Sequence, residues 1–214
     1  MNDSSDSSKE LRFACTRCGN CCTDQGTIVN VTYSDILRIK NGLKLSGDEL
    51  LEVLGFYWPE KEIDKRLLQK MMIPPIKTEK GWAFIGLFKK NDGRCYFYDE
   101  DKKKCLIYEL RPSFCRTFPF SFKILFDKKD KTKAKIKMYY TEKGKQYCPG
   151  IGPDAPVIDG KQWIKLGKKT LEDINENNIV IQKWNENVDK GLIKPSVKKF
   201  LQLILNLDKN KTKT

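Results

Sequence analysis

The sequence predicts an α+β fold in which a small antiparallel sheet and loops surround a cysteine-rich site, flanked by N-terminal and C-terminal helices. Apolar residues recur with the helical period near both ends of the chain. Aromatic and β-branched segments, separated by charged turns, occupy the middle, and cysteines lie in or just before these segments. With 214 residues, of which 39% are hydrophobic, the chain suits one domain or one domain with a helical appendage.

Composition divides the chain into three regions. Residues 1–10 are rich in Ser and Asp and lack an apolar stretch, so we expect a disordered tail and no secretory signal. Residues 11–160 contain all eight cysteines and form the expected cysteine-cluster, metal-binding domain. Residues 161–214 form the expected C-terminal helical region, with helices over 161–187 and 196–207.

Helix signals also precede the aromatic segments. Thr32 and Asp35 form a capping arrangement ahead of an apolar pattern, and Gly42 is the expected end of that helix. A capping box opens a second predicted helix over residues 46–54. A third helix is predicted over residues 60–72, where two prolines end it.

The middle of the chain is predicted to be β. Residues 82–88 form an apolar strand, and residues 96–98 and 106–108 form a hairpin around a charged turn. A second hairpin pairs residues 120–126 with residues 134–141, again around a charged tip. The predicted sheet therefore lies in the part of the chain that carries the later cysteines.

The residue composition restricts the chemistry. Eight cysteines without an export signal predict a cytoplasmic location, where clustered thiols are more often metal ligands or redox groups than disulfides. The absence of histidine excludes Ser-His and Cys-His catalytic groups and the zinc-hydrolase sites that depend on imidazole. Any metal site must be all-thiolate, or completed by carboxylate, water or another molecule. No run of 18 apolar residues is present, so no transmembrane segment is expected.

The formal net charge is +13, which raises the question of an acidic partner such as nucleic acid, anionic lipid or an acidic protein. The excess is greatest over residues 123–145, with nine Lys against three acidic residues. We favour a solvated Lys-rich surface, because the lysines are interleaved with acids and no nucleic-acid motif is present. The expected partner is an unidentified protein or small molecule, with nucleic acid as the weaker alternative.

The strongest signal is the run Cys15-x2-Cys18-x2-Cys21. Two residues between cysteines let a tight turn direct both sulfurs at one centre, as in zinc knuckles and iron–sulfur loops. Gly19 suits such a loop because glycine tolerates positive φ and close backbone approach. Cys22 follows directly, and adjacent side chains project in different directions. Cys22 therefore either serves a second metal or is a free or redox-active thiol.

The remaining cysteines allow two four-ligand sites. Three of them are separated by nine residues each, and the last precedes a proline, as in bacterial ferredoxins. The two groups in this partition are Cys15, Cys18, Cys21 and Cys148, and Cys22, Cys95, Cys105 and Cys115. One metal site with spare structural cysteines is the alternative. Because thiolate binds both metals, the cofactor is either zinc or an iron–sulfur cluster, and among clusters we favour [4Fe–4S].

Together with downstream residues, the first motif resembles the CxxCxxCC cysteine-cluster family, described as zinc- or iron-chelating proteins. The resemblance covers roughly residues 12–150. The matching residues are Cys15-x2-Cys18-Gly19-x-Cys21-Cys22, Val31 to Ile36 with Arg38-Ile39, Gly93-x-Cys95-x-Phe97, Cys105-x-Ile107-Tyr108 and Arg111-Pro112-x2-Cys115-Arg116-x-Phe118-Pro119. The resemblance implies metal-binding cysteines. Members are often labelled iron–sulfur oxidoreductases, and one branch resembles flagellin lysine N-methylases.

Two classes of function remain open from the sequence. The first is an iron–sulfur protein that acts in electron transfer or in modification of another protein, such as lysine methylation. The second is a non-enzymatic zinc- or iron-binding module with a basic partner-binding surface, in which metal binding supplies folding free energy. No residue outside the cysteines is a candidate catalytic acid or base.

The side chains around Cys115 are further candidates. Arg111 and Arg116 either donate hydrogen bonds to cluster sulfur or bind an anionic cosubstrate, or they form ion pairs with Glu109 or Asp99. Four aromatic residues with a period of two also lie near this cysteine in the sequence, namely Phe114, Phe118, Phe120 and Phe122. We expect them to form a core face or an apolar shield around a metal.

Overall fold

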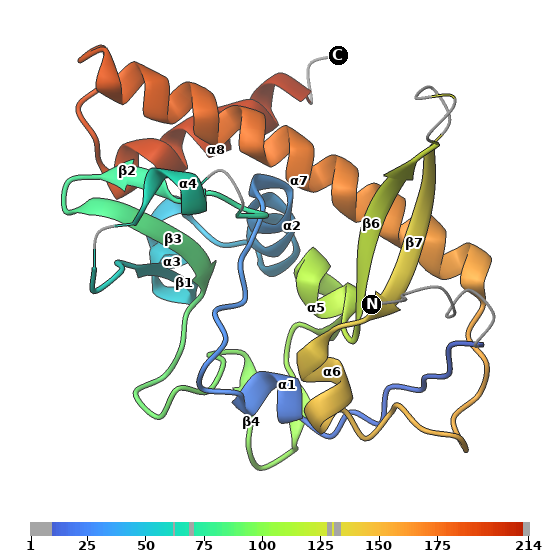
Figure 1. The fold of residues 1–214 in the computed structure, drawn as a ribbon. Helices are drawn as coiled ribbons and strands as arrows, with labels where there is room; N and C mark the ends of the chain where they lie inside the picture. The colour runs from blue at the N-terminus through green and yellow to red at the C-terminus, as the bar shows by residue number, and fades with distance from the viewer. Residues whose placement is uncertain (1–9, 62, 69–70, 128–129, 131–133, 212–214) are drawn as a thin grey trace.

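The computed structural model describes residues 10–61, 63–68, 71–127, 130 and 134–211. The fold is α+β, as predicted, with helices before and after small antiparallel sheets. Figure 1 shows the long helix α7 crossing the molecule, with a three-stranded sheet and a two-stranded hairpin at its opposite ends. Apart from Glu10, the predicted disordered tail lies outside the described residues.

The elements alternate along the chain. The helices are α1 (Asn20–Thr23), α2 (Tyr33–Leu43), α3 (Gly47–Val53), α4 (Lys65–Leu68), α5 (Ser113–Thr117), α6 (Glu142–Tyr147), α7 (Gly160–Asp189) and α8 (Val197–Lys211), with a 3-10 turn at Tyr108–Leu110. The strands are β1 (Leu54–Tyr57), β2 (Ile76–Thr78), β3 (Gly81–Leu87), β4 (Tyr98–Asp99), β5 (Lys104–Cys105), β6 (Phe120–Phe126) and β7 (Ala134–Tyr140). They form three antiparallel sheets, in the orders β1-β3-β2, β4-β5 and β6-β7.

The capping arrangement predicted for α2 is confirmed. The Thr32 side chain accepts from the Asp35 N–H, and the Asp35 carboxylate accepts from the Thr32 N–H. The predicted end at Gly42 is wrong, because the helix continues to Leu43 and is capped by Lys44, whose φ is 56°. Gly42 lies within α2, where an added Cβ would come 2.5 Å from Leu110. The glycine therefore permits close packing and does not terminate the helix.

Two other predicted helices are shorter than expected. The capping box of α3 is confirmed, but Leu54 leaves the helix and starts β1, where it pairs with Leu87 of β3. Sheet pairing with a distant strand thus overrides the local helical pattern. Of predicted residues 60–72, only Lys65–Leu68 is helical among the described residues. Strand β2 was not predicted.

The two predicted hairpins differ in how fully they form. Strands β6 and β7 pair in register from Phe120–Tyr140 to Phe126–Ala134, which confirms the second hairpin almost residue for residue. The first hairpin is reduced to two residues in each strand. Its second arm, predicted over residues 106–108, instead turns into the 3-10 segment. Both predicted C-terminal helices are confirmed as α7 and α8.

The main apolar core lies where α2, α3, α7 and α8 meet the three-stranded sheet. Trp184 of α7 and Phe200 of α8 are 2% and 1% exposed, and their rings meet edge to face at 5.2 Å. Helix α7 also satisfies backbone groups near the edge strand β2. The Trp184 indole donates to the Lys77 carbonyl at 2.9 Å, and the Asn185 amide oxygen accepts from the Lys77 N–H at 2.8 Å. These contacts protect the exposed edge of β2.

We predict that Phe200→Ala lowers the free energy of unfolding by about 3–5 kcal/mol, because it removes a fully buried ring and leaves a cavity beside Trp184. Urea denaturation followed by circular dichroism measures this change. Leu192→Ala is the control. Its side chain is 71% exposed, and its loss should change stability by less than about 0.5 kcal/mol. Equal effects of the two substitutions would contradict the assigned core.

Candidate metal centre

Cys15 and Cys18 lie on a loop that leads into the short helix α1, and α1 itself carries Cys21 and Cys22. Gly19 precedes that helix with a φ of 81°, and a Cβ there would lie 2.5 Å from the Tyr98 hydroxyl. Both its backbone angle and its surroundings therefore require glycine. The Cys22 N–H donates to the Gly19 carbonyl at 2.7 Å, which closes the turn that carries Cys21 and Cys22.

Backbone hydrogen bonds join this loop to the later cysteine segments. The Cys95 N–H donates to the Cys22 carbonyl at 2.8 Å. On the other side, the Ala14 N–H donates to the Gly150 carbonyl at 3.0 Å. A Cβ on Gly150 would lie 2.2 Å from the Ala14 carbonyl oxygen, so glycine is needed for this approach. These contacts hold segments from three parts of the chain side by side.

Helix α5, which carries Cys115, is anchored by a buried carboxylate. Asp35 is 0% exposed, and its Oδ1 accepts from both the N–H and the hydroxyl of Ser113 at 3.0 Å. Arg38 donates to the same carboxylate and to the Arg111 carbonyl, at 2.5 and 2.8 Å. The start of α2 therefore fixes the start of α5, and with it the position of Cys115.

All eight cysteines line two neighbouring cavities. The larger, which we call the thiol cavity, has a volume of about 350 Å³, and the smaller about 50 Å³. The cysteines of the thiol cavity are Cys15, Cys21, Cys22, Cys95, Cys105 and Cys115, and those of the smaller cavity are Cys15, Cys18, Cys21, Cys115 and Cys148. The shared residues show that the two cavities adjoin. The fold thus gathers cysteines that are 133 positions apart in the sequence, from position 15 to position 148.

The cysteines are free thiols, and their chemistry suits zinc or iron. Their sulfurs do not converge on a single point. Among the described residues, no three Cys, Asp or Glu side chains are arranged to hold one metal ion. The donor set therefore fits a thiophilic metal, whereas binding of a single ion would require several side chains to turn inward.

Two arginines bring positive charge to the thiols. Arg111 lines both cavities, donates through Nε to the Tyr108 carbonyl at 2.9 Å and stacks 3.7 Å from the Tyr108 ring centroid. Arg17 also lines both cavities and lies 4.6 Å from the same centroid. This arrangement holds two guanidinium groups beside thiols that carry negative charge when they bind metal.

The surroundings lower the pKa of one thiol and raise the pKa values of five others. Cys21 and Cys22 form a hydrogen-bonded pair with sulfurs 4.0 Å apart. The hydrogen bond from Cys22 outweighs desolvation and, with the charge of Arg111, lowers the pKa of Cys21 from 9.0 to about 7. The same hydrogen bond, followed by burial, raises the pKa of Cys22. Desolvation also raises the pKa values of Cys95, Cys105, Cys115 and Cys148. Metal binding by these thiols would displace protons.

A polar cluster around Asp24 connects the first cysteine loop to α6. Its carboxylate accepts from Lys143 Nζ at 2.6 Å, from the Tyr147 hydroxyl at 3.1 Å and from the Thr27 hydroxyl. Desolvation acts to raise the pKa of Asp24, but these hydrogen bonds outweigh it and hold the pKa well below its ordinary value. The charged carboxylate therefore stabilises the contact between α1 and α6, the helix that leads to Cys148.

Other side chains named from the sequence have separate positions. Arg111 faces the thiols, whereas Arg116 is exposed and lines neither cavity. In the described part of the chain, neither arginine forms an ion pair with Glu109 or Asp99. Phe120 and Phe122 are buried, and with Phe114 and Phe118 they line a separate apolar cavity beside the thiols. The core-face interpretation of these phenylalanines agrees with this burial.

The sequence model of one family, "CxxCxxCC: Putative zinc- or iron-chelating domain", matches residues 14–149. The chain belongs to the CxxCxxCC family. An uncharacterized protein of Methanocaldococcus jannaschii, MJ0661, is 27% identical over 202 residues, which cover 94% of this chain and 87% of that protein. No solved structure matches the chain.

Membership in the CxxCxxCC family agrees with the resemblance seen in the sequence and supports a zinc- or iron-binding role for the cysteine domain. No described helix is both long and apolar enough to span a membrane. Asp24, Lys143 and Arg17 were not predicted as site residues. Asp24 and Lys143 are 119 positions apart, and no local pattern marks such a pair.

We predict that Asp24→Asn lowers the free energy of unfolding at pH 7 by about 1–3 kcal/mol, because it weakens a charge-assisted hydrogen-bond cluster. The folded-state pKa of Asp24 is depressed, so its stabilisation is present above the unfolded pKa and is lost as pH falls through the folded value. Wild-type stability should therefore decrease more steeply on acidification than that of the variant. Urea titrations across this pH range measure the difference.

The control is Asp154→Asn, which changes an exposed carboxylate outside the cluster. It should leave both the stability at pH 7 and the pH dependence close to those of the wild type. An Asp24→Asn protein with the wild-type acid profile would contradict the assigned role of this carboxylate.

Proposed function

We propose that the eight cysteines hold metal in two groups, as the sequence partition suggested. The observation that carries this proposal is the distribution of thiols around two adjoining cavities. Cys22, Cys95, Cys105 and Cys115 line the thiol cavity, and Cys15, Cys18, Cys21 and Cys148 line the smaller one. Cys15, Cys21 and Cys115 line both, so the two groups would be close neighbours. Residues 11–160 would be the metal-binding domain, and residues 161–214 its helical support.

The shape of the thiol cavity favours an iron–sulfur cluster over a zinc ion in this position. A zinc ion draws four ligands to about 2.0–2.3 Å from one point, and no such convergence is present among the described side chains. Six thiols spaced around about 350 Å³ suit a group that has several metal atoms and a volume of its own. When bound, a [4Fe–4S] cluster supplies one-electron transfer. The chain's contribution is to hold its thiolates, shield them with apolar walls and place Arg17 and Arg111 beside them.

The activity that follows from this assignment is electron transfer to or from another molecule, or modification of a protein substrate such as the lysine methylation of the related branch. The proposed location is the cytoplasm, where a reducing environment keeps eight thiols available for metal.

A non-enzymatic zinc- or iron-binding module is the second candidate, and one surface favours it. The β6–β7 hairpin exposes Phe126 at 64% and Ile124 at 43%, together with the exposed lysines Lys123, Lys135 and Lys137. Such a mixed apolar and basic surface suits binding to an acidic partner. In this case the metal would mainly stabilise the cysteine loops, whose regular β structure is limited to the two-residue strands β4 and β5.

Anaerobic purification followed by iron, zinc and acid-labile sulfide analysis separates these candidates. We expect iron and sulfide in equal amounts, with the visible charge-transfer absorption of an iron–sulfur centre. A colourless protein that holds zinc and no sulfide would support the zinc module and contradict the cluster assignment.

Serine substitutions test the partition into two groups. We expect Cys18→Ser and Cys105→Ser each to remove a different part of the metal, because each residue lines only one cavity. The double variant should then lose the metal of both sites. Thr16→Ser, a hydroxyl-for-hydroxyl change in the same loop, should retain full metal content. Loss of all metal in either single variant would contradict two independent sites, and unchanged metal in both would contradict the ligand assignment.

A further inference from the structure

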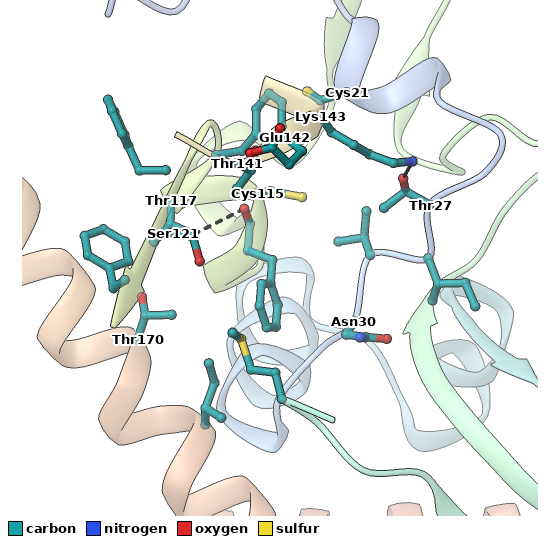
Figure 2. Close-up of a pocket in the computed structure, with 18 of the residues that line it drawn as sticks. Cys21, Thr27, Asn30, Cys115, Thr117, Ser121, Thr141, Glu142, Lys143 and Thr170 are labelled. Carbon is teal, nitrogen blue, oxygen red and sulfur yellow. Dashed lines mark hydrogen bonds between the residues drawn. The ribbon is translucent and has the colours of Figure 1, made fainter. Parts of the chain in front are cut away.

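We propose that the apolar cavity beside the thiols binds an uncharged, mainly apolar organic molecule that carries a hydrogen-bond acceptor. This cavity has a volume of about 390 Å³ and lies between α5, β6, α6, α7 and residues 27–30. Figure 2 shows residues of its walls, with Cys21 and Cys115 in the upper part of the view and Thr170 on the orange helix α7 at the left. Its volume lies near the lower end of the range for ligand cavities, which suits a ring-sized molecule and excludes a dinucleotide.

The side chains that line the cavity are mostly apolar and therefore favour a ligand that is mostly apolar. Phe114, Phe118 and Phe122 contribute aromatic surface, and Leu171 and Ile174 of α7 contribute aliphatic surface. Apolar and aromatic walls with a few polar groups are the usual construction of a small-molecule site. Helix α7 can approach β6 closely here because Gly167 has no side chain. A Cβ at that position would lie 2.2 Å from the Phe122 ring.

The charged groups at the cavity are already paired, which argues for an uncharged ligand. Lys143 is neutralised by Asp24 at 2.6 Å, and Glu142 pairs with Lys145 at 2.9 Å. An ionic ligand would have to break one of these pairs or enter apolar surroundings without a partner. Hydrogen bonding is still available. A lysine ammonium has three N–H donors, and Asp24 and Thr27 engage two of those of Lys143.

The position of the cavity connects its occupant to the cysteine site. Cys21 and Cys115 line both the apolar cavity and the thiol cavity, and Tyr147 lines both the apolar cavity and the smaller cysteine cavity. A molecule in the apolar cavity would therefore lie next to thiols of both proposed metal groups. Its assignment as the substrate of a redox centre rests on the proposed function, whereas its binding does not.

The test uses 6-propionyl-2-dimethylaminonaphthalene, an uncharged aromatic ketone whose carbonyl oxygen accepts hydrogen bonds and whose fluorescence shifts to the blue in apolar surroundings. We expect the purified, metal-loaded protein to bind about one molecule per chain, more tightly than the anionic anilinonaphthalene sulfonate. Ser121 lies on the cavity wall, so Ser121→Leu should fill part of the cavity and weaken binding of the uncharged probe by about tenfold or more, equivalent to about 1.4 kcal/mol. Ser121→Ala, which removes the hydroxyl without adding volume, should retain binding.

Two further variants complete the test. Leu171→Phe fills the cavity from α7 and should weaken binding in the same way, which keeps the test valid if Ser121→Leu does not fold. Phe126→Ser removes the most exposed aromatic of the β6 tip and should leave binding unchanged, which excludes binding to that surface. Probe binding that survives both filling variants, is lost in Phe126→Ser, or is tighter for the anionic probe would overturn the proposal.

Metal and sulfide analysis of the same samples keeps the two proposals separate. Probe binding by a protein without the expected metal would contradict the proposed function and support the cavity. A fully loaded protein that does not bind the uncharged probe would contradict the cavity and leave the metal assignment in place.

Discussion

The buried carboxylate of Asp35 joins the helical core to the helix that carries Cys115. It caps α2, which belongs to the helical core, and it accepts two hydrogen bonds from Ser113 at the start of α5. A fully buried carboxylate is costly unless its oxygens are satisfied. Because hydrogen bonds satisfy both of its oxygens, the Asp35 carboxylate holds Thr32, Arg38 and Ser113 in a fixed relative position. The core built by α2, α7 and α8 thereby helps to determine where Cys115 lies, together with the packing of Leu110 against Gly42 of α2.

The cysteine site depends on such polar links because it has little regular structure of its own. Strands β4 and β5 are two residues each, and α1 and α5 are single turns. Its position is maintained by single hydrogen bonds between distant segments, such as those of Cys95 with Cys22 and of Ala14 with Gly150, and by the Asp24 cluster. Loops held in this way can adjust, which is consistent with thiols that surround cavities without converging on one point.

The position of helix α5 explains why an apolar cavity adjoins the thiols. Helix α5 presents Cys115 toward the cysteine loops, while Phe114 and Phe118 face the space between β6 and α7. Apolar walls limit the access of water to neighbouring thiolates. The electrostatic attraction between these thiolates and the guanidinium groups of Arg17 and Arg111 is therefore stronger than it would be in water. One short helix therefore borders two chemically different spaces.

Features that depend on the local spacing of residues could be predicted from the amino-acid sequence. These include the α+β class, the capping of α2 and α3, the β6–β7 hairpin, the C-terminal helices, and the cysteine motif that identifies the family. Other features follow from long-range contacts in the folded chain: Leu54 leaves its helix to pair with Leu87, and Gly42 allows packing against Leu110. Long-range contacts also set which cysteines border which cavity and bring Lys143 to Asp24. Capping and periodicity act within a few residues, whereas these contacts join residues tens to more than a hundred positions apart and leave no repeating pattern in the sequence.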